Sequence, residues 1–341
     1  MSIYAIYPSL IRPVLFCLDP ENAHSLTINA GHLLSKPPFT KLFGQKVVSK
    51  PVEIMGLKFD NPLGLAAGMD KNGDAIDFLG ALGFGHLELG TVTPLAQEGN
   101  ARPRMFRVKE AQGLINRMGF NNKGVDYLVK NLQQRHYQGI IGVSIGKNEI
   151  TPIERAAEDY LHCMNKVYNY ADYIAVNISC PNTKDLTALQ EAGPLVALLS
   201  TLKQEQGKLA SEHNKYVPLV VKIAPDLDDV QLEAICDACL KLKIDGMTCT
   251  NTTTSRDEIY GLPHASEWGG LSGQPLRHKS NIVLQKVAAH LKGQIPIIGV
   301  GGVDGVMAAR EKLQAGASLV QLYSAFVYQG PSLIQDIVNN L

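Results

Sequence analysis

The chain has 341 residues, of which 45% are hydrophobic and 19% are charged, as is typical of a large folded protein with a substantial core. Its 32 Lys and Arg residues balance 32 Asp and Glu residues, so the formal net charge is zero. This balance and the lack of a basic stripe argue against nucleic acid as the main partner.

The first 47 residues are expected to form a small N-terminal extension of two helices. Within residues 2–18, apolar residues recur every three or four positions, which indicates a helix with one apolar face. Asp19 and Pro20 predict an N-cap and a first-turn proline that begin a second helix ending near Leu34. These helices could lie on a bilayer surface or simply pack on the rest of the protein.

No signal peptide, transmembrane span or metal site is expected. Arg12 and Pro13 interrupt the apolar N-terminal stretch, and no apolar run approaches the roughly 20 residues that a spanning helix needs. The six cysteines are scattered, which is not the pattern of a disulfide framework. Cys236 and Cys239 form a C-x-x-C within a helical stretch, and we interpret them as two helix residues one turn apart.

Eight short apolar, β-branched runs follow the extension. Such continuous runs are typical of strands buried on both faces, and amphipathic helical stretches such as 151–171, 228–242 and 305–315 lie between them. The alternation predicts a (β/α)₈ TIM barrel over residues 48–341, with a doubly wound open sheet as the alternative. The eight runs are 62–68, 85–92, 139–146, 173–179, 218–224, 246–251, 295–302 and 318–326.

Polar residues gather at the carboxyl ends of these strands, which meet at one rim of such a barrel and carry its chemistry. They are Lys71, Thr91, Ser144, Asn177, Cys180, Lys222, Thr250, Asn251 and Thr252. The last two strands end in Gly299-Val-Gly301-Gly302 and Tyr323-Ser324. Glycine loops at this place often bind phosphate through backbone N–H groups, although the same glycines could merely form tight turns. The sequence has no nucleotide-binding G-x-G-x-x-G or P-loop pattern.

Along nearly its whole length the chain resembles the dihydroorotate dehydrogenases. Eight stretches carry the resemblance in order: Asn61-PLGLAAGMDKNG, Ile115-NRMGFNN, Asn177-ISCPNT, Val221-KIAPD, Thr250-NTT, Gly269-GLSGQPL, Gly299-VGGV and Leu319-VQLYSAF. The extension with Asp19-PENAH resembles the membrane-associated, quinone-linked class.

The resemblance implies oxidation of (S)-dihydroorotate to orotate in de novo pyrimidine (UMP) biosynthesis, with FMN as hydride acceptor and a membrane quinone as terminal acceptor. It also implies a peripheral location on the cytoplasmic face of the inner membrane, with the N-terminal helices on the lipid surface. By matching position, the flavin would be contacted by Ala66, Ala67, Gly68, Thr91, Ser144, Asn177, Lys222 and Thr250, and its phosphate held by Gly273, Gly302, Tyr323 and Ser324.

The same matching implies the other sites. The substrate would be bound by Lys71, Asn116, Arg117, Met118, Gly119, Phe120, Asn177, Asn182, Asn251 and Thr252. The catalytic base would be Cys180. The quinone head group would lie near His24, Arg107 and Tyr323. A loop over residues 183–190 would cover the substrate, although Lys184, Asp185 and Thr187 depart from the family's usual residues.

The residue types suit these roles. Asparagine side chains offer one acceptor and two donors to the amide edge of a pyrimidine, and four of them in one pocket are hard to explain as packing. Lys71 could pair with the carboxylate of orotate. Lys222 could stabilise negative charge on reduced flavin, or could be a plain buried ion pair.

Two residues depart from the quinone-linked pattern, which usually has Ser and Asn where this chain has Cys180 and Ser144. A cysteine is a suitable base, since its ordinary pKa of about 8.5 leaves some thiolate near neutral pH. We expect it to take the C5 proton while hydride leaves C6, unless Cys180 is only a small buried filler. Because the soluble class has a cysteine base, a soluble acceptor (fumarate or NAD) is an alternative to the quinone.

Two other functions remain to be tested. A phosphate-binding barrel aldolase with Lys222 as Schiff base would explain the lysine and the glycine loops, but not the four asparagines. A non-catalytic binding module would not need Cys180.

Overall fold

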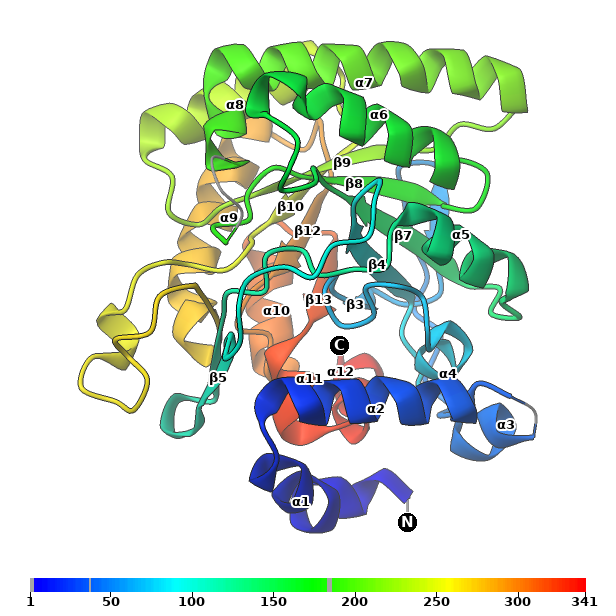
Figure 1. The fold of residues 1–341 in the computed structure, drawn as a ribbon, viewed down its shortest axis with the longest axis vertical. Helices are drawn as coiled ribbons and strands as arrows, with labels where there is room; N and C mark the ends of the chain where they lie inside the picture. The colour runs from blue at the N-terminus through cyan, green and yellow to red at the C-terminus, as the bar shows by residue number, and fades with distance from the viewer. Residues whose placement is uncertain (1–2, 37, 183–185) are drawn as a thin grey trace.

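The computed structural model describes residues 3–36, 38–182 and 186–341, and its centre is a closed barrel of eight parallel strands (Figure 1). The strands pair in the order β10-β12-β13-β3-β4-β7-β8-β9. Their bounds are β3 (Leu63–Leu65), β4 (His86–Val92), β7 (Ile140–Ile145), β8 (Tyr173–Asn177), β9 (Leu219–Ile223), β10 (Gly246–Cys249), β12 (Ile297–Val300) and β13 (Leu319–Leu322). Each lies within one of the eight predicted runs, so the predicted barrel is confirmed and the open sheet is excluded.

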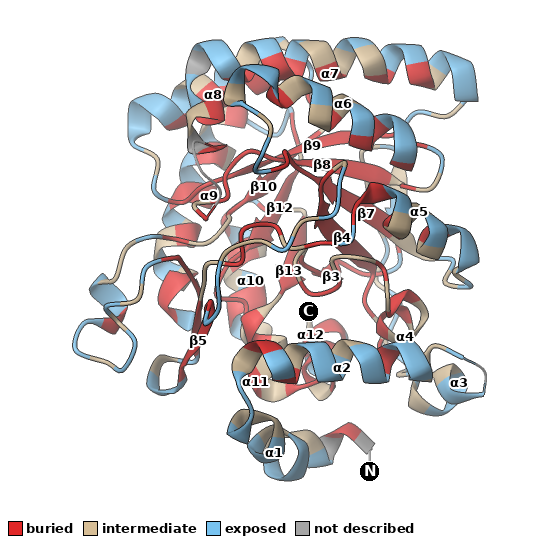
Figure 2. Ribbon diagram, viewed as in Figure 1, coloured by how far each residue is buried: buried red, intermediate tan, exposed pale blue. Residues whose placement is uncertain are grey.

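Helices connect the strands and cover the barrel, whose strand residues are buried apart from the half-buried Ile140 (Figure 2). They are α4 (Ile76–Ala81), α5 (Val125–Gln134), α6 (Ala156–Val167), α7 (Ala192–His213), α8 (Asp229–Lys241), α9 (Arg277–Leu291), α10 (Val306–Gln314), α11 (Ser324–Gln329) and α12 (Ser332–Asn340). The three helices predicted over 151–171, 228–242 and 305–315 are present as α6, α8 and α10. Asp228 begins α8 with a capping box to Gln231, which satisfies backbone N–H groups of the first turn.

The amino end of the barrel is closed by a hairpin that the sequence patterns did not reveal. Its strands are β1 (Val52–Ile54) and β2 (Leu57–Phe59), paired antiparallel. Phe59 is fully buried and packs in one cluster with Tyr173 and Leu319 from inside the barrel. With this end plugged by apolar side chains, ligands must enter from the carboxyl end.

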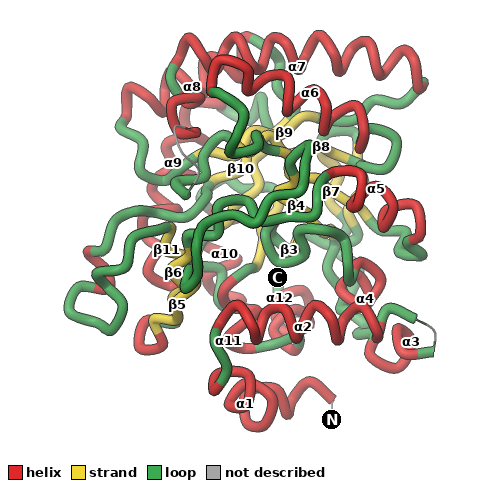
Figure 3. Tube along the Cα trace, in the orientation of Figure 1, coloured by secondary structure: helices red, strands yellow, loops and turns green. Residues whose placement is uncertain are grey.

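Above the carboxyl end lies a three-stranded antiparallel sheet, also missed by the sequence patterns (Figure 3). It consists of β5 (Met105–Val108), β6 (Gly113–Asn116) and β11 (Gly270–Gly273). The segments that follow β4 and β10 along the chain thus meet over the mouth of the barrel. This pairing places Asn116 opposite Gly270.

In the N-terminal extension the second expected helix is present, whereas the first is replaced by shorter helical segments. Helix α2 (Pro20–Leu34) begins where Asp19 accepts hydrogen bonds from the backbone N–H groups of Glu21 and Asn22. Residues 3–17 form a 3₁₀ turn, a π turn and the short helix α1 (Arg12–Cys17) rather than one helix. A further short helix, α3 (Phe39–Phe43), follows α2, which packs against α4 and β5.

Candidate active site

A cavity that contains many polar side chains opens at the carboxyl end of the barrel, where the strand ends were expected to bring polar residues together. Twenty of the residues expected to bind ligands, or to act on them, line it. They are Ala66, Ala67, Gly68, Lys71, Thr91, Asn116, Met118, Gly119, Phe120, Asn177, Cys180, Asn182, Lys222, Thr250, Asn251, Thr252, Gly273, Gly302, Tyr323 and Ser324.

The four asparagines come together in this cavity as two hydrogen-bonded pairs. Asn182 Nδ2 lies 3.2 Å from Asn116 Oδ1, and Asn251 Nδ2 lies 3.4 Å from Asn177 Oδ1. Asn177 Nδ2 donates in turn to Thr91 Oγ1 at 2.8 Å. Oδ1 of Asn182 is buried without a hydrogen-bond partner among the described residues. A buried acceptor in this state is suited to an N–H group of a ligand.

Lys71, in the loop after β3, places an ammonium group in the same cavity. Burial lowers the pKa of Lys71 to about 8, and the negative charge of Glu21 partly offsets this effect. Within the described parts of the chain, no carboxylate lies within ion-pair distance of Lys71 Nζ. A ligand carboxylate would supply the missing counter-charge.

Cys180 lies in the loop after β8, and its side chain is buried against the cavity. The start of this loop is held by Tyr160 of α6, whose hydroxyl donates to the carbonyl of Asn177 at 2.7 Å. The backbone N–H of Ser179 donates to Asn177 Oδ1 at 3.4 Å. The thiol therefore shares one cavity with the asparagine amides and the lysine.

Lys222 forms a buried ion pair and also lines the cavity. Its Nζ lies 3.6 Å from Glu88 Oε1 inside the barrel. Glu88 Oε2 accepts hydrogen bonds from Tyr173 and Gln321, each at 3.0 Å. Glu88 and Gln321 were not identified from the sequence as residues of the site. The signal that could have indicated them is the presence of a polar residue within an otherwise apolar strand.

The glycine-rich loops reach the cavity with their backbone. Gly302 has φ +72°, and a Cβ there would lie 2.3 Å from Arg277 Cβ. Gly273 has φ +92°, and its Cβ would lie 2.3 Å from the carbonyl oxygen of Gln112. Only glycine fits these tight turns. Gly301 of the predicted glycine loop also lines the cavity. Cavity-lining residues not expected from the sequence are Gln112, Ser272, Gln274, Leu276, Val300, Val303, Asp304, Gln321 and Ala325.

Two of the residues expected to bind flavin or substrate, Ser144 and Arg117, do not line the cavity in the described chain. The hydroxyl of Ser144 is fully buried and lies 2.8 Å from Thr91 Oγ1, one layer below the cavity surface. The guanidinium of Arg117 turns away to pair with Glu267 at 2.6 Å and lies over the ring of Trp268. The part of the expected lid at residues 183–185 falls outside the described chain.

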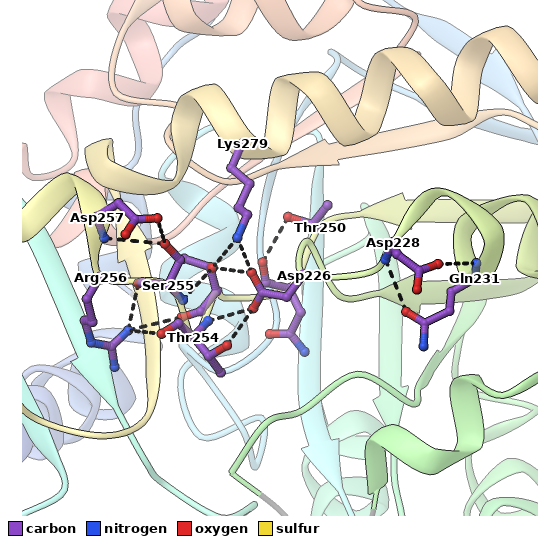
Figure 4. A network of polar contacts seen from close by, with 11 residues as sticks. Asp226, Asp228, Gln231, Thr250, Thr254, Ser255, Arg256, Asp257 and Lys279 are labelled. Carbon is purple, nitrogen blue, oxygen red and sulfur yellow. Dashed lines mark hydrogen bonds and ion pairs between the residues drawn. The ribbon is translucent and has the colours of Figure 1, made fainter.

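A network of polar contacts holds the loop after β10, which carries Asn251 and Thr252 (Figure 4). Its centre is Asp226, which accepts hydrogen bonds from the Thr254 backbone N–H at 2.7 Å and from Thr253 Oγ1 at 2.5 Å. Lys279 of α9 contacts the same carboxylate at 2.5 Å. This anchor was not singled out in the sequence.

A second pocket is apolar and lies between the extension and the barrel, lined from α1, α2, α4 and α11 among other elements. His24, Arg107 and Tyr323 line it together, as expected. Arg107 is fixed by the carbonyl of Leu18, to which Nη1 donates at 2.8 Å. Burial, aided by the charge of Lys71, lowers the pKa of His24 to about 3, so its imidazole is neutral.

Tyr323 lines both pockets and so stands between them. The Tyr323 ring packs closely on the backbone of Gly68, where an added Cβ would lie only 3.3 Å from the ring. Two ligands could thus be brought to opposite sides of one aromatic residue.

Within the described ranges, no three or more His, Cys, Asp or Glu side chains are grouped so that they could hold a metal ion. Cys236 and Cys239 are both buried in α8, as expected of packing residues. In the same ranges, none of the helices combines the length and apolar character needed to cross a membrane.

A (β/α)₈ barrel with a ligand cavity at its carboxyl end is the architecture of a large class of enzymes. A model of the family described as dihydroorotate dehydrogenase matches residues 50–341. The chain belongs to the dihydroorotate dehydrogenase family.

Individual relatives cover nearly the whole chain. Dihydroorotate dehydrogenase (quinone) of Psychromonas ingrahamii is 55% identical over 336 residues, which are 98% of this chain and 100% of the relative. That of Edwardsiella ictaluri is 55% identical over 335 residues, covering 98% and 99%. The crystal structure of Eimeria tenella DHODH in complex with ferulenol superposes with a TM-score of 0.88 at 33% identity, covering 99% of this chain and 93% of that one.

Proposed function

We propose that this chain oxidises (S)-dihydroorotate to orotate, with FMN as hydride acceptor and a membrane quinone as terminal acceptor, in de novo pyrimidine (UMP) biosynthesis. The observation that carries the proposal is one cavity that holds two pairs of asparagine amides, a thiol, and an ammonium for which the described residues provide no ion-paired carboxylate. Family membership and relatives described as quinone-dependent support the same reaction.

The residues present fit FMN. Gly273 and Gly302 line the cavity with backbone alone, and Ser324 lies beside them to hold the phosphate. Ala66, Ala67, Gly68, Thr91, Asn177 and Thr250 line the part of the cavity assigned to the ring system. FMN, when bound, supplies a two-electron acceptor for the hydride that leaves C6 of the substrate. Lys222 provides a positive charge that stabilises negative charge on the reduced cofactor.

The substrate is bound by groups that match its chemistry. The asparagine amides pair with the ring edge, and Lys71 pairs with the carboxylate. Met118, Gly119 and Phe120 form the adjoining wall. Cys180 takes the proton from C5, so the substrate loses one proton and one hydride and becomes orotate.

The aldolase is disfavoured because Lys222 Nζ is engaged with Glu88, whereas a Schiff-base lysine needs a free amine. Borohydride trapping of an adduct on Lys222 would support the aldolase. A soluble acceptor would leave the apolar second pocket without a function.

We propose that residues 1–47 form a docking extension on a barrel of residues 48–341, and that it binds the cytoplasmic face of the inner membrane peripherally. The apolar pocket beside His24 and Arg107 takes the quinone head group. The exposed apolar side chains of the extension include Leu10, Val14, Leu33 and Leu42, at 62%, 66%, 64% and 68% exposure. Apolar groups exposed together beside an apolar pocket suit a lipid surface.

The decisive experiment for the reaction is anaerobic mixing of the yellow holoenzyme with dihydroorotate while the flavin spectrum is followed. We expect bleaching, then return of the colour on addition of a short-chain quinone but not of fumarate or NAD. Protein that stays colourless after incubation with FMN, or that dihydroorotate does not bleach, would contradict the proposal.

Membrane docking is tested by Val14→Glu combined with Leu10→Glu, measured by flotation with anionic lipid vesicles. We expect loss of flotation and slower quinone reduction with unchanged bleaching by dihydroorotate. The matched control is Val230→Glu on α8, where the side chain is 78% exposed on the barrel. Equal flotation of both variants and wild type would contradict docking through the extension.

A further inference from the structure

Helix α2 carries a buried carboxylate, Glu21, that does not line the quinone pocket in the described chain. Its side chain is only 6% exposed, although it belongs to the first turn of a surface helix. Arg104 binds it with two hydrogen bonds, Nη2 to Oε1 at 2.7 Å and Nε to Oε2 at 3.0 Å. Arg102, which is 62% exposed, adds a contact at 2.9 Å. A buried bidentate pair of this kind is geometrically specific.

Arg104 connects Glu21 to residues of the substrate pocket through further hydrogen bonds. Its Nη1 donates to the carbonyl oxygens of Glu98 and Asn100, at 2.6 and 2.7 Å. Nδ2 of Asn100 then donates to the carbonyl oxygens of Arg117 and Asn182, at 2.9 and 3.1 Å. One continuous hydrogen-bonded path therefore joins α2 to the backbone of a substrate-binding asparagine.

Glu21 also acts on Lys71 by charge. Among the charged groups that face Lys71, Glu21 is the strongest that favours its protonated form, and Asp70 adds to it. Arg104 opposes protonation, as does burial. His24, one turn beyond Glu21 on α2, faces Lys71 as a neutral ring. The same helix thus places a carboxylate and a neutral imidazole near the ammonium that would bind the substrate carboxylate.

We propose that Glu21 is a positioning residue for the substrate pocket: it holds Asn182 in place through Arg104 and Asn100, and its negative charge favours the cationic form of Lys71. The N-terminal extension then takes part in dihydroorotate binding as well as in quinone reduction. This inference rests on the proposed substrate roles of Lys71 and Asn182.

The expected signature is a change in pH dependence. Lys71 is cationic below its pKa, so affinity for the orotate carboxylate is kept at low pH and lost as pH rises through about 8. Without the charge of Glu21, this loss moves to lower pH. The cationic fraction of Lys71 would therefore fall most near pH 8 and change little at pH 6, which lies well below its pKa.

The test is titration of the full-length holoenzyme with orotate, followed by the flavin difference spectrum between pH 6 and pH 9. We expect Glu21→Gln, which keeps the side-chain volume, to weaken orotate binding by at least about fivefold at pH 8, with a smaller loss at pH 6. Arg102→Gln is the matched control, because it removes an exposed contact to the same carboxylate and leaves Arg104 in place; it should bind as wild type.

Asn100→Ala separates the two parts of the proposal. It removes the donors to Arg117 and Asn182 but keeps the Glu21–Arg104 pair, so binding should weaken roughly fivefold with no shift in pH dependence. This variant also carries the test of the path if Glu21→Gln does not purify with flavin.

Wild-type affinity of Glu21→Gln at every pH would overturn the proposal, and an equal loss at every pH would overturn the role of its charge. Failure of wild-type protein to bind orotate would instead contradict the proposed function.

Discussion

Replacing Lys222 by Met should leave Glu88 as an unpaired carboxylate inside the barrel. The two side chains are 7% and 0% exposed, and their charged atoms lie 3.6 Å apart. Oε1 of Glu88 has no hydrogen-bond partner among the described residues, so Lys222 is the group that compensates this oxygen. Oε2 keeps its hydrogen bonds from Tyr173 and Gln321 in the variant.

The magnitude follows from distance and burial. Two unit charges separated by 3.6 Å attract by about 5 kcal/mol at an effective dielectric constant of about 20. Removing one partner of a buried pair commonly costs about 3–5 kcal/mol, while replacing both partners by neutral groups costs much less. We therefore expect Lys222→Met to lower the free energy of unfolding by about 3–5 kcal/mol, and Glu88→Gln with Lys222→Met to recover most of this loss.

Urea unfolding followed by far-ultraviolet circular dichroism, with saturating FMN throughout, measures the stability. Anaerobic flavin reduction by dihydroorotate measures the chemistry, and it should stay slow in both variants that lack the lysine. A double variant no more stable than Lys222→Met would refute the energetic coupling of the pair. A double variant with wild-type flavin reduction would refute the role of the cation in the reaction.

Three other predictions follow from single sites. Cys180→Ala should keep yellow FMN, but its flavin should be reduced about 10²–10⁴-fold more slowly than in the wild type. Cys180→Ser should keep partial activity. Near wild-type turnover of the alanine variant would exclude Cys180 as the base. Burial lowers the pKa of Lys312 to about 7, whereas in the unfolded chain the pKa is about 10.5. Above about pH 7 the unfolded state binds more protons than the folded state, so the stability of the wild type should rise with pH. Urea unfolding midpoints measured from pH 6 to 9.5 should show this rise in the wild type but not in Lys312→Met. Asp226→Asn should loosen the loop that carries Asn251 and so raise the KM for dihydroorotate in steady-state assays. Lys286→Gln, which removes an exposed ion pair, is the control. An unchanged KM in Asp226→Asn would contradict the anchoring role.

Local sequence patterns were sufficient for the barrel and for the rim of its active site. Continuous apolar runs separated by amphipathic stretches have few stable arrangements, and parallel strands place their carboxyl ends at one edge. The positions of Lys71, Asn177 and Asn251 at strand ends therefore predict that they share one cavity. Asp19 and Pro20 predicted the start of α2 because capping depends on adjacent residues alone.

Tertiary structure alone decided how distant segments meet. The sheet of β5, β6 and β11 joins excursions that follow different barrel strands, so no local period reveals it. The pairing of Glu21 with Arg104 spans 83 positions, and that of Glu88 with Lys222 links two strands across the barrel interior. Arg117 was expected to bind the substrate, but in the tertiary structure its guanidinium pairs with Glu267. Which charged groups pair depends on the three-dimensional arrangement of the backbone. These contacts could therefore not be inferred from spacing along the chain.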